Sequence, residues 1–235
     1  MLSKFSFAAL LSAVSAQTAG SEDFKFWCSA WCEQTSLVVP RYATCTVTDP
    51  SGVYGTTGTV EFLQNKTIVS WVNKYDGEPC WLGDYCKGYE DIGLTNVNAN
   101  VQNLDEGLHG FHVHSYGTLD TGCGGAGGHF NPTGVNHAAW DAPVRHVGDL
   151  QQLFVPDDGS RTATLNYDDP LAGLWDTNAI SGRAIVIHLG EDDLGLGGDP
   201  TCSLQNGCAG PRVGCGIITP AAAPSDFASP YFVAN

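Results

Sequence analysis

The chain has 235 residues, of which 43% are hydrophobic and 15% are charged, so it can form one sizeable core and is neither disordered nor collagen-like. Ten basic residues stand against 25 acidic ones, a formal net charge of -15. Because nucleic acids and anionic membranes are bound through basic faces, this balance argues against both partners, while a small anionic substrate stays compatible with it.

The first sixteen residues predict a secretory signal peptide, residues 1–16. A single cation, Lys4, precedes an apolar run over residues 5–14, and the small residues Ser15 and Ala16 follow. The run is shorter than the roughly 20 apolar residues that span a bilayer, and no later stretch approaches that length. We therefore expect a secreted, extracellular protein without a membrane span, with an N-terminal extension over residues 17–39.

Short β-branched or alternating runs, separated by Gly, Asp, Asn and Pro, predict eight strands and no long helix. They cover residues 41–48, 57–65, 92–103, 108–115, 146–155, 161–167, 179–189 and 213–219. Eight strands with turn signals between them predict an all-β sandwich or barrel.

Three long segments interrupt the strands. Residues 116–145 are rich in Gly and residues 190–212 in Gly and Asp, and loops of this length inside a domain usually carry function. Residues 66–91 are predicted to form an inserted hairpin or Ω-loop stapled by a disulfide. The sequon Asn65-Lys66-Thr67 makes Asn65 a candidate glycosylation site.

Nine cysteines fit the oxidising compartment that a signal peptide implies. Three pairs are close in sequence and are predicted to be disulfides: Cys28 with Cys32, Cys80 with Cys86, and Cys202 with Cys208. Zinc-finger spacing is the alternative, and it is disfavoured because each pair lies far from the histidines.

The chemistry is expected at the seven histidines, which occupy positions 109, 112, 114, 129, 137, 146 and 188. His112 and His114 are two apart on a predicted strand, so both rings leave the same face and can reach one metal. Asp149 follows His146 by three residues, and together these side chains exceed the needs of one tetrahedral site. Histidine and carboxylate without thiolate favour copper and zinc over an iron–sulfur cluster or a calcium loop. We interpret His109 as structural.

Several motifs resemble copper/zinc superoxide dismutase. Residues 107–114 read Gly-Leu-His-Gly-Phe-His-Val-His, residues 128–132 read Gly-His-Phe-Asn-Pro, and residues 145–150 read Arg-His-Val-Gly-Asp-Leu. Residues 182–188, 191–195 and 207–218 follow in the family's order. The resemblance is strong over 106–218, weaker over 40–65 and 96–103, and absent from the N-terminal segment, from the 66–91 insert and from the C-terminal tail at 221–235. It implies an eight-stranded antiparallel Greek-key barrel or sandwich with two long functional loops, in a domain spanning residues 40–220.

The resemblance also implies two metal sites that share one ligand. Copper would be held by His112, His114, His129 and His188, and zinc by His129, His137, His146 and Asp149. Asp192 matches a carboxylate that orients one histidine of each site, and Arg212 matches a cation beside the open copper position. Cys123 and Cys215 match the family disulfide, and Cys45 matches a buried thiol that would be left without a partner.

The implied function is that of a secreted superoxide dismutase, an oxidoreductase that converts superoxide into dioxygen and hydrogen peroxide. Copper would be reduced and reoxidised in turn, zinc would be the structural partner, and His129 and Arg212 would be the catalytic residues. The family often forms a homodimer through its last strand, a surface that the inserts here could cover or replace.

Two alternatives keep the fold but change the function: a catalytically silent copper carrier, and a secreted zinc-only or adhesive domain. The intact ligand set and Arg212 argue against both. Two residues beside the site depart from the family pattern, Ser115 after the second histidine of the strand motif and Cys208 in the Arg212 motif.

Overall fold

The computed structural model describes residues 32–74, 80, 89–223 and 232–234, and almost all of its regular structure is β. The expected signal peptide, most of the N-terminal extension, Cys28 and Cys86 lie outside these residues. The strands are β1 (Cys32–Thr48), β2 (Thr57–Asn73), β3 (Tyr89–Gln102), β4 (Gly107–His109), β5 (Phe111–His114), β6 (Asp120–Cys123), β7 (Leu153–Val155), β8 (Thr162–Asp169), β9 (Ala184–His188), β10 (Arg212–Ile217), β11 (Thr219–Ala221) and β12 (Phe232–Ala234). The short helical segments are α2 (Ser203–Asn206) and the 3-10 turns η4 (Gly124–Ala126) and η5 (Asp176–Asn178). No helix among the described residues has the length and apolar character that crossing a membrane requires.

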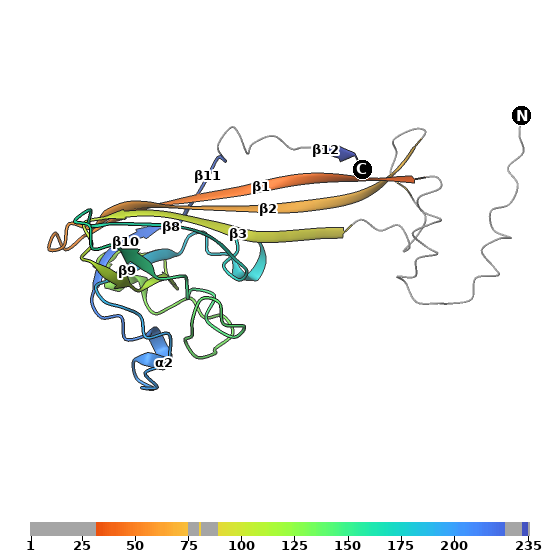
Figure 1. Ribbon diagram of the computed structural model, residues 1–235. Coiled ribbons are helices and arrows are strands. Elements are labelled where there is room, and N and C mark those ends of the chain that lie inside the picture. Colours follow the sequence, from red (N-terminus) through yellow and green to blue (C-terminus); the bar gives the residue numbers. More distant parts are fainter. Residues whose placement is uncertain (1–31, 75–79, 81–88, 224–231, 235) are drawn as a thin grey trace, which may run out of the picture. The chain divides into compact units, whose positions relative to one another are not determined.

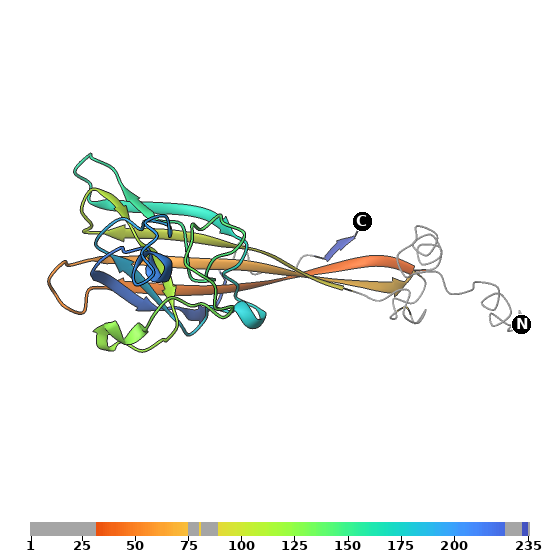
Figure 2. The same cartoon turned by 90° about the horizontal axis from the view of Figure 1, so that it is seen from below.

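The strands form one large antiparallel sheet in the order β5-β9-β10-β1-β2-β3-β8 (Figure 1). Strands β11 and β12 both pair with β1, and β4 pairs with β7 in a second, two-stranded sheet. Figure 2 shows β1, β2 and β3 running side by side. The predicted all-β antiparallel fold is therefore confirmed.

The structure divides into two compact units. The larger consists of the described residues within 38–66 and 92–230, and the smaller of the described residues before 38, between 67 and 91, and after 230. Within the smaller unit, β12 pairs with the first part of β1 at Thr35↔Ala234, and a disulfide joins Cys32 to Cys80.

The core of the larger unit follows from the alternation of side chains along its strands. On β2, the side chains of Val60, Phe62 and Gln64 are buried at every second position. Strand β9 is buried at all five positions, which is why its sequence, Ala-Ile-Val-Ile-His, is a continuous apolar run that ends at His188. This places a histidine at the end of a central, rigid strand.

Gly216 on β10 allows the last long strand to approach β1 closely. A Cβ at this position would lie 2.1 Å from the carbonyl oxygen of Thr46 and 2.7 Å from Cys45 Sγ, so no larger residue fits without a shift of the backbone.

Three of the eight predicted strands are clearly shorter or more broken than expected, and one of them, predicted over residues 179–189, is reduced to Ala184–His188. The 108–115 run divides into β4 and β5, because Gly110 bonds to the loop after β9: its N–H donates to Gly190 O at 2.9 Å. Of residues 146–155, only Leu153–Val155 form a strand. The residues before them join the metal-binding segment, where the Gly148 N–H donates to Phe130 O at 3.0 Å.

The segment predicted as an irregular insert, residues 66–91, contains more strand than expected. Strand β2 continues to Asn73 and β3 begins at Tyr89, so the described ends of the insert prolong two neighbouring strands of the sheet. The run Ile-Val-Ser-Trp-Val at residues 68–72 carries this signal, since β-branched and aromatic residues favour strands.

Candidate metal centre

Strands β5 and β9 place three histidines at one end of the sheet. His112 and His114 lie two apart on β5, as the sequence predicts, and β5 pairs with β9, the strand that ends at His188. The 116–152 segment returns along β5 through isolated bridges between His112 and Asp149 and between His114 and His129. The strand motif and the long loop therefore meet at one point.

The first cluster contains the four residues expected to bind copper. Their ligand atoms all lie within 4.8 Å of one another, and each side chain is buried: His112, His114, His129 and His188. In every ring one nitrogen has a hydrogen-bond partner and the other has none. The unpartnered buried atoms are His112 Nδ1, His114 Nε2, His129 Nε2 and His188 Nε2.

The partnered nitrogens face the surrounding protein. His114 Nδ1 donates to Gly127 O at 2.8 Å, and His188 Nδ1 donates to Gly210 O at 2.9 Å. A hydrogen bond that fixes one ring nitrogen leaves the other with its lone pair exposed, as in metal-ligating histidines. Four converging lone pairs in a buried cluster fit a copper ion, and without a cation they would be uncompensated buried acceptors.

The second cluster converges on one carboxylate oxygen. Asp149 Oδ1 lies 2.8 Å from His129 Nδ1, 2.9 Å from His137 Nδ1 and 3.1 Å from His146 Nδ1. The second oxygen, Oδ2, accepts from the backbone N–H of His146 at 2.9 Å and from that of Ala138 at 3.2 Å. Three imidazoles and one carboxylate within 4.8 Å are a donor set that suits tetrahedral zinc. His129 belongs to both clusters.

Asp192 joins the two clusters from outside. Its Oδ2 accepts from His112 Nε2 at 2.6 Å and its Oδ1 from His137 Nε2 at 2.8 Å. A single buried carboxylate thus orients one histidine of each cluster, the geometry that the resemblance implied for this residue.

Burial controls the charge of the copper-type cluster. Desolvation lowers the pKa of His112 and of His114 well below the usual value, with the neighbouring His129 adding to the effect. It also lowers the pKa of His188, to about 4. Desolvation lowers the pKa of His129 as well, although Asp149 opposes the shift. These rings are therefore neutral at pH 7 and have a lone pair available for a metal.

The two carboxylates of the metal centre, Asp149 and Asp192, show the opposite balance. Burial alone would raise the pKa of Asp149, but hydrogen bonds from three histidines lower it far below the usual value. The pKa of Asp192 is lowered in the same way by His112 and His137. Although burial disfavours the charged form of His137, its contacts with both carboxylates raise its pKa to about 9. Both carboxylates are thus ionised and the zinc-type cluster attracts a cation.

Arg212 lies at the start of β10, where it is paired in register with His188. Its Nη1 donates to Cys123 O at 2.7 Å and its Nη2 to Gly127 O at 2.6 Å. The Cys123–Cys215 disulfide joins the loop carrying these acceptors to β10. Partial burial lowers the pKa of the guanidinium, which nevertheless stays charged at neutral pH. A fixed cation therefore lies beside the copper-type cluster.

The predicted disulfides of the first two close pairs are wrong. Cys32 is bonded to Cys80, so it cannot pair with Cys28, nor Cys80 with Cys86. Strands β1 and β2 are neighbours in the sheet, and this pairing brings together two cysteines that are 48 residues apart. Closeness in sequence therefore misled the prediction. Cys202 is bonded to Cys208, Cys123 to Cys215, and Cys45 is a buried free thiol.

Two supporting residues were missed by the sequence analysis. Arg145 is buried, forms a two-pronged ion pair with Asp169 at 2.8 and 2.9 Å, and donates to the carbonyl oxygens of His146 and Asp149. Gln152 holds the backbone of Asp192 through two hydrogen bonds, at 3.0 and 2.8 Å. A charged residue directly before a ligand, Arg145 before His146, was the available signal, but its partner is distant in sequence.

The remaining residues near the site have structural contacts. His109 is buried, and both of its ring nitrogens bond to backbone carbonyls, those of His188 and Asp105, as its structural interpretation requires. Ser115, which departs from the family pattern, donates from Oγ to His129 O at 3.0 Å. Asn65, the candidate glycosylation site, is exposed on strand β2.

Comparison with family models agrees with this geometry. A model described as copper/zinc superoxide dismutase matches residues 87–218, which include every member of both clusters, Asp192 and Arg212.

Proposed function

The chain belongs to the copper/zinc superoxide dismutase family, and we propose that it performs the dismutation with one copper and one zinc ion held by its two joined clusters. Members of this family are oxidoreductases that act on superoxide. The proposed copper ligands are His112, His114, His129 and His188. The proposed zinc ligands are His129, His137, His146 and Asp149. The observation that carries the proposal is the set of buried, unpartnered ring nitrogens that converge in the copper-type cluster.

The metals and the protein have different tasks. When bound, copper supplies one-electron chemistry by alternating between Cu(II) and Cu(I), and zinc supplies a fixed positive charge. The protein must attract superoxide, orient it and deliver protons. Two superoxide anions and two protons give one dioxygen and one hydrogen peroxide.

His129 is the proposed proton carrier. Its Nδ1 lies on the side of Asp149, and its Nε2 is the unpartnered atom on the copper side. In the first half of the cycle Nε2 takes up a proton, and in the second half it returns that proton to the departing peroxide. Solvent supplies the other proton. The contact with Asp149 keeps the ring in place throughout.

Arg212 is proposed to hold the anion. Its two hydrogen bonds to carbonyl oxygens fix the guanidinium, so its charge does not have to reorganise when superoxide arrives. Asp192 is proposed to keep His112 and His137 in their ligating orientations.

We also propose that the protein is secreted, by means of a signal peptide at residues 1–16. The disulfides of the structure support an oxidising compartment. The proposed domain covers residues 40–220, with an extension at 17–39, an insert at 66–91 and a tail at 221–235. We further propose a glycan at Asn65, which mass spectrometry of the secreted protein tests. We also propose a homodimer, which a measurement of the protein's mass in solution tests.

The function is tested by following superoxide removal in purified, secreted protein. We expect activity that is lost when a chelator removes copper and that returns when copper is added back. A protein that binds copper but does not remove superoxide would instead be a copper carrier, and one that retains no copper would be a zinc-only or adhesive domain.

A further inference from the structure

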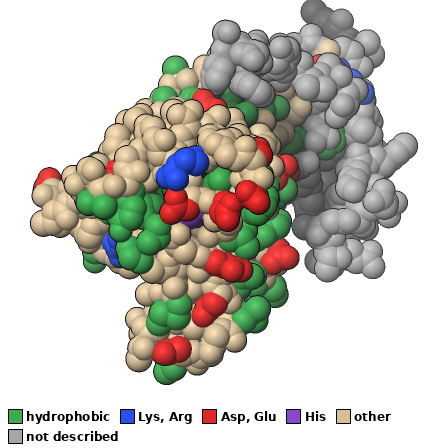
Figure 3. Space-filling view, turned by 60° about the vertical axis from the view of Figure 1, so that its left-hand side comes forward, with side chains coloured by type: hydrophobic (Ala, Val, Ile, Leu, Met, Phe, Trp, Pro, Cys, Tyr) green, Lys and Arg blue, Asp and Glu red, His purple; other side chains and the backbone are tan. Residues whose placement is uncertain are grey.

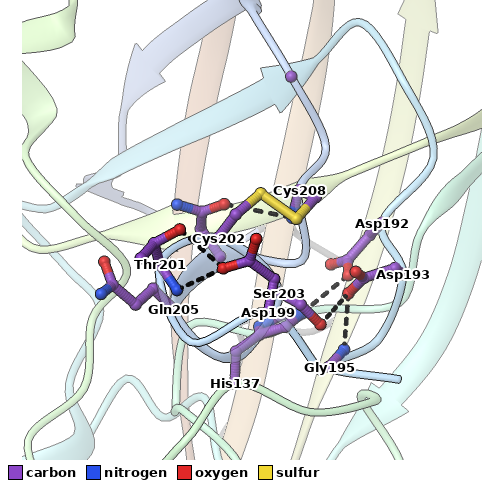
Figure 4. The surroundings of a disulfide bond; sticks show 12 residues. His137, Asp192, Asp193, Gly195, Asp199, Thr201, Cys202, Ser203, Gln205 and Cys208 are labelled. Atoms are coloured by element: carbon purple, nitrogen blue, oxygen red, sulfur yellow. Dashed lines mark hydrogen bonds and ion pairs between the residues drawn. A yellow bond between two sulfur atoms is a disulfide. The ribbon is translucent and has the colours of Figure 1, made fainter. Parts of the chain in front are cut away.

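A disulfide closes the short helix that lies over the metal centre. Cys202 and Cys208 flank α2, and their Cα atoms are 5.0 Å apart. Figure 4 shows the surroundings of this disulfide, among them Asp192 and His137. An isolated helix of one turn is unstable in water, so α2 depends on tertiary constraints. Within it, the Asn206 N–H donates to Cys202 O at 2.8 Å.

The residue between α2 and Cys208 lies directly against the metal-site side chains. A Cβ placed on Gly207 would be 1.8 Å from Asp192 Oδ1 and 2.7 Å from His137 Nε2. The backbone of Gly207 therefore packs on the hydrogen bond that joins these two groups. Only glycine leaves room for that bond.

Two backbone hydrogen bonds attach the same segment to the metal-binding residues. Leu204 O accepts from the His137 N–H at 2.9 Å, and Gly207 O accepts from the Asp193 N–H at 2.8 Å. In addition, Ser203 Oγ donates to Asp193 Oδ1 at 2.9 Å. The helix thus holds His137 on one side and the residue after Asp192 on the other.

The chain leaves α2 through a turn that needs support. Gly207 has φ 69° and Cys208 has φ 50°, so both lie in the left-handed region. A non-glycine residue is uncommon there and persists when its surroundings hold it. The covalent bond from Cys208 to Cys202 provides this support at the residue next to Gly207.

We propose that the Cys202–Cys208 disulfide positions the metal centre through Gly207 and Asp192. By holding α2 closed, it keeps the Asp192 carboxylate between His112 and His137 and slows the release of zinc. Neither cysteine touches the reacting atoms, so both are positioning residues. The effect on zinc rests on the proposed zinc site, whereas the effect on the loop does not.

The variant C202S/C208S tests the proposal. We expect zinc to pass from the loaded protein to a chromogenic chelator about tenfold faster than from wild type, since loss of groups that orient metal ligands typically weakens affinity by roughly 10- to 100-fold. The matched control is C32S/C80S, which removes one disulfide from the smaller unit. Its zinc release should equal that of wild type. Equal release from C202S/C208S and wild type would overturn the proposal.

A mutant cycle tests the route through Asp192. We expect D192N to release zinc faster than wild type, and D192N/C202S/C208S to release it no faster than D192N, because the disulfide acts through this carboxylate. If the triple variant released zinc faster than D192N by the same factor that separates C202S/C208S from wild type, the disulfide would act by another route. This result would contradict the proposal.

A readout without metal separates failure of this inference from failure of the proposed function. In metal-free protein, the amide hydrogens of His137 and Asp193, which bond to α2 and Gly207, should exchange at least several-fold faster in C202S/C208S than in wild type. Unchanged exchange would overturn the positioning role. If exchange is faster in C202S/C208S than in wild type but the wild-type protein takes up no zinc, the positioning role stands and the zinc site is wrong.

Discussion

The metal centre is assembled from histidines whose two ring nitrogens have different tasks. One nitrogen of each copper-type ring bonds to a carbonyl or carboxylate, and the other is buried without a partner. Burial also keeps these rings neutral. The residue types, the pairing of His112 with His114 and the orienting role of Asp192 could be predicted from the sequence and the resemblance. The outer bonds of His114 and His188 could not, because they involve backbone carbonyls of other loops.

Removal of one copper-type ligand should affect the two metals unequally. We expect His188→Ala to abolish dismutation and copper retention while about one zinc per chain remains, since His188 belongs to only one cluster. The Asp149→Ala variant should show the opposite pattern and lose its zinc before its copper. Metal analysis of both variants checks this, and a fully active His188→Ala protein would contradict the copper assignment.

The buried ion pair of Arg145 and Asp169 should be essential for stability. Asp169→Asn leaves the guanidinium without its charge partner in the interior, so we expect a loss of about 3–5 kcal/mol in the free energy of unfolding. Asp105→Asn is the matched control, because its pair with Arg161 is exposed and contributes little. Urea unfolding of metal-free protein measures both, and equal effects of the two substitutions would refute the prediction.

Cys45 should make the protein sensitive to alkali. Burial raises the pKa of its thiol to about 12, so the folded protein keeps a proton that the unfolded chain loses near pH 9. The stabilising contribution is complete below pH 9 and is lost as the pH rises toward 12. Between pH 8 and pH 11, the midpoint temperature of thermal unfolding should therefore fall more steeply in wild type than in Cys45→Ala. Parallel pH profiles would count against a buried, protonated thiol.

At the level of elements, the period-two alternation of side chains predicted most of the strands, but it did not predict where they are interrupted. Strands β4 and β5 are separated because Gly110 bonds to the loop after β9, a contact that local sequence does not encode. Local sequence likewise does not encode the disulfide between Cys32 and Cys80, because these residues come together only through the pairing of strands in the sheet. Cys202 and Cys208 are six residues apart and flank one turn, so sequence proximity was a sufficient guide there.

The loop between β9 and β10 should steer superoxide weakly. Residues 189–211 contain no Lys or Arg, and they include Glu191, Asp192, Asp193 and Asp199. Of these, Asp192 is buried in the metal centre, while Glu191 and Asp199 are exposed. Exposed carboxylates on this loop should oppose the attraction that Arg212 exerts on superoxide.

This balance predicts a dismutation rate that depends only shallowly on ionic strength. Gln205, exposed on α2, offers a position for a new charge, and Gln205→Lys should raise the rate several-fold at low salt. Arg212→Glu should lower it at every salt concentration. Pulse radiolysis across a salt series measures these rates. A steep fall of the wild-type rate with added salt would show that positive charge elsewhere does the steering.

Over the whole molecule, acidic side chains outnumber basic ones, 25 to 10. Figure 3 shows this excess of Asp and Glu among the described residues of one face. The charge acts mainly at low salt, because a unit charge 10 Å away in water contributes only about 0.4 kcal/mol and screening sets in beyond roughly 8 Å at physiological strength. We therefore expect superoxide capture to be decided close to the metals.

The proposed dismutation depends on two metal sites that share His129. The most direct measurement is the copper and zinc content of the wild-type protein after loading with both ions and removal of loosely bound metal. One copper and one zinc per chain is the predicted result. A chain that retains a single ion, or that fills both clusters equally well with zinc when copper is present in excess, would contradict it.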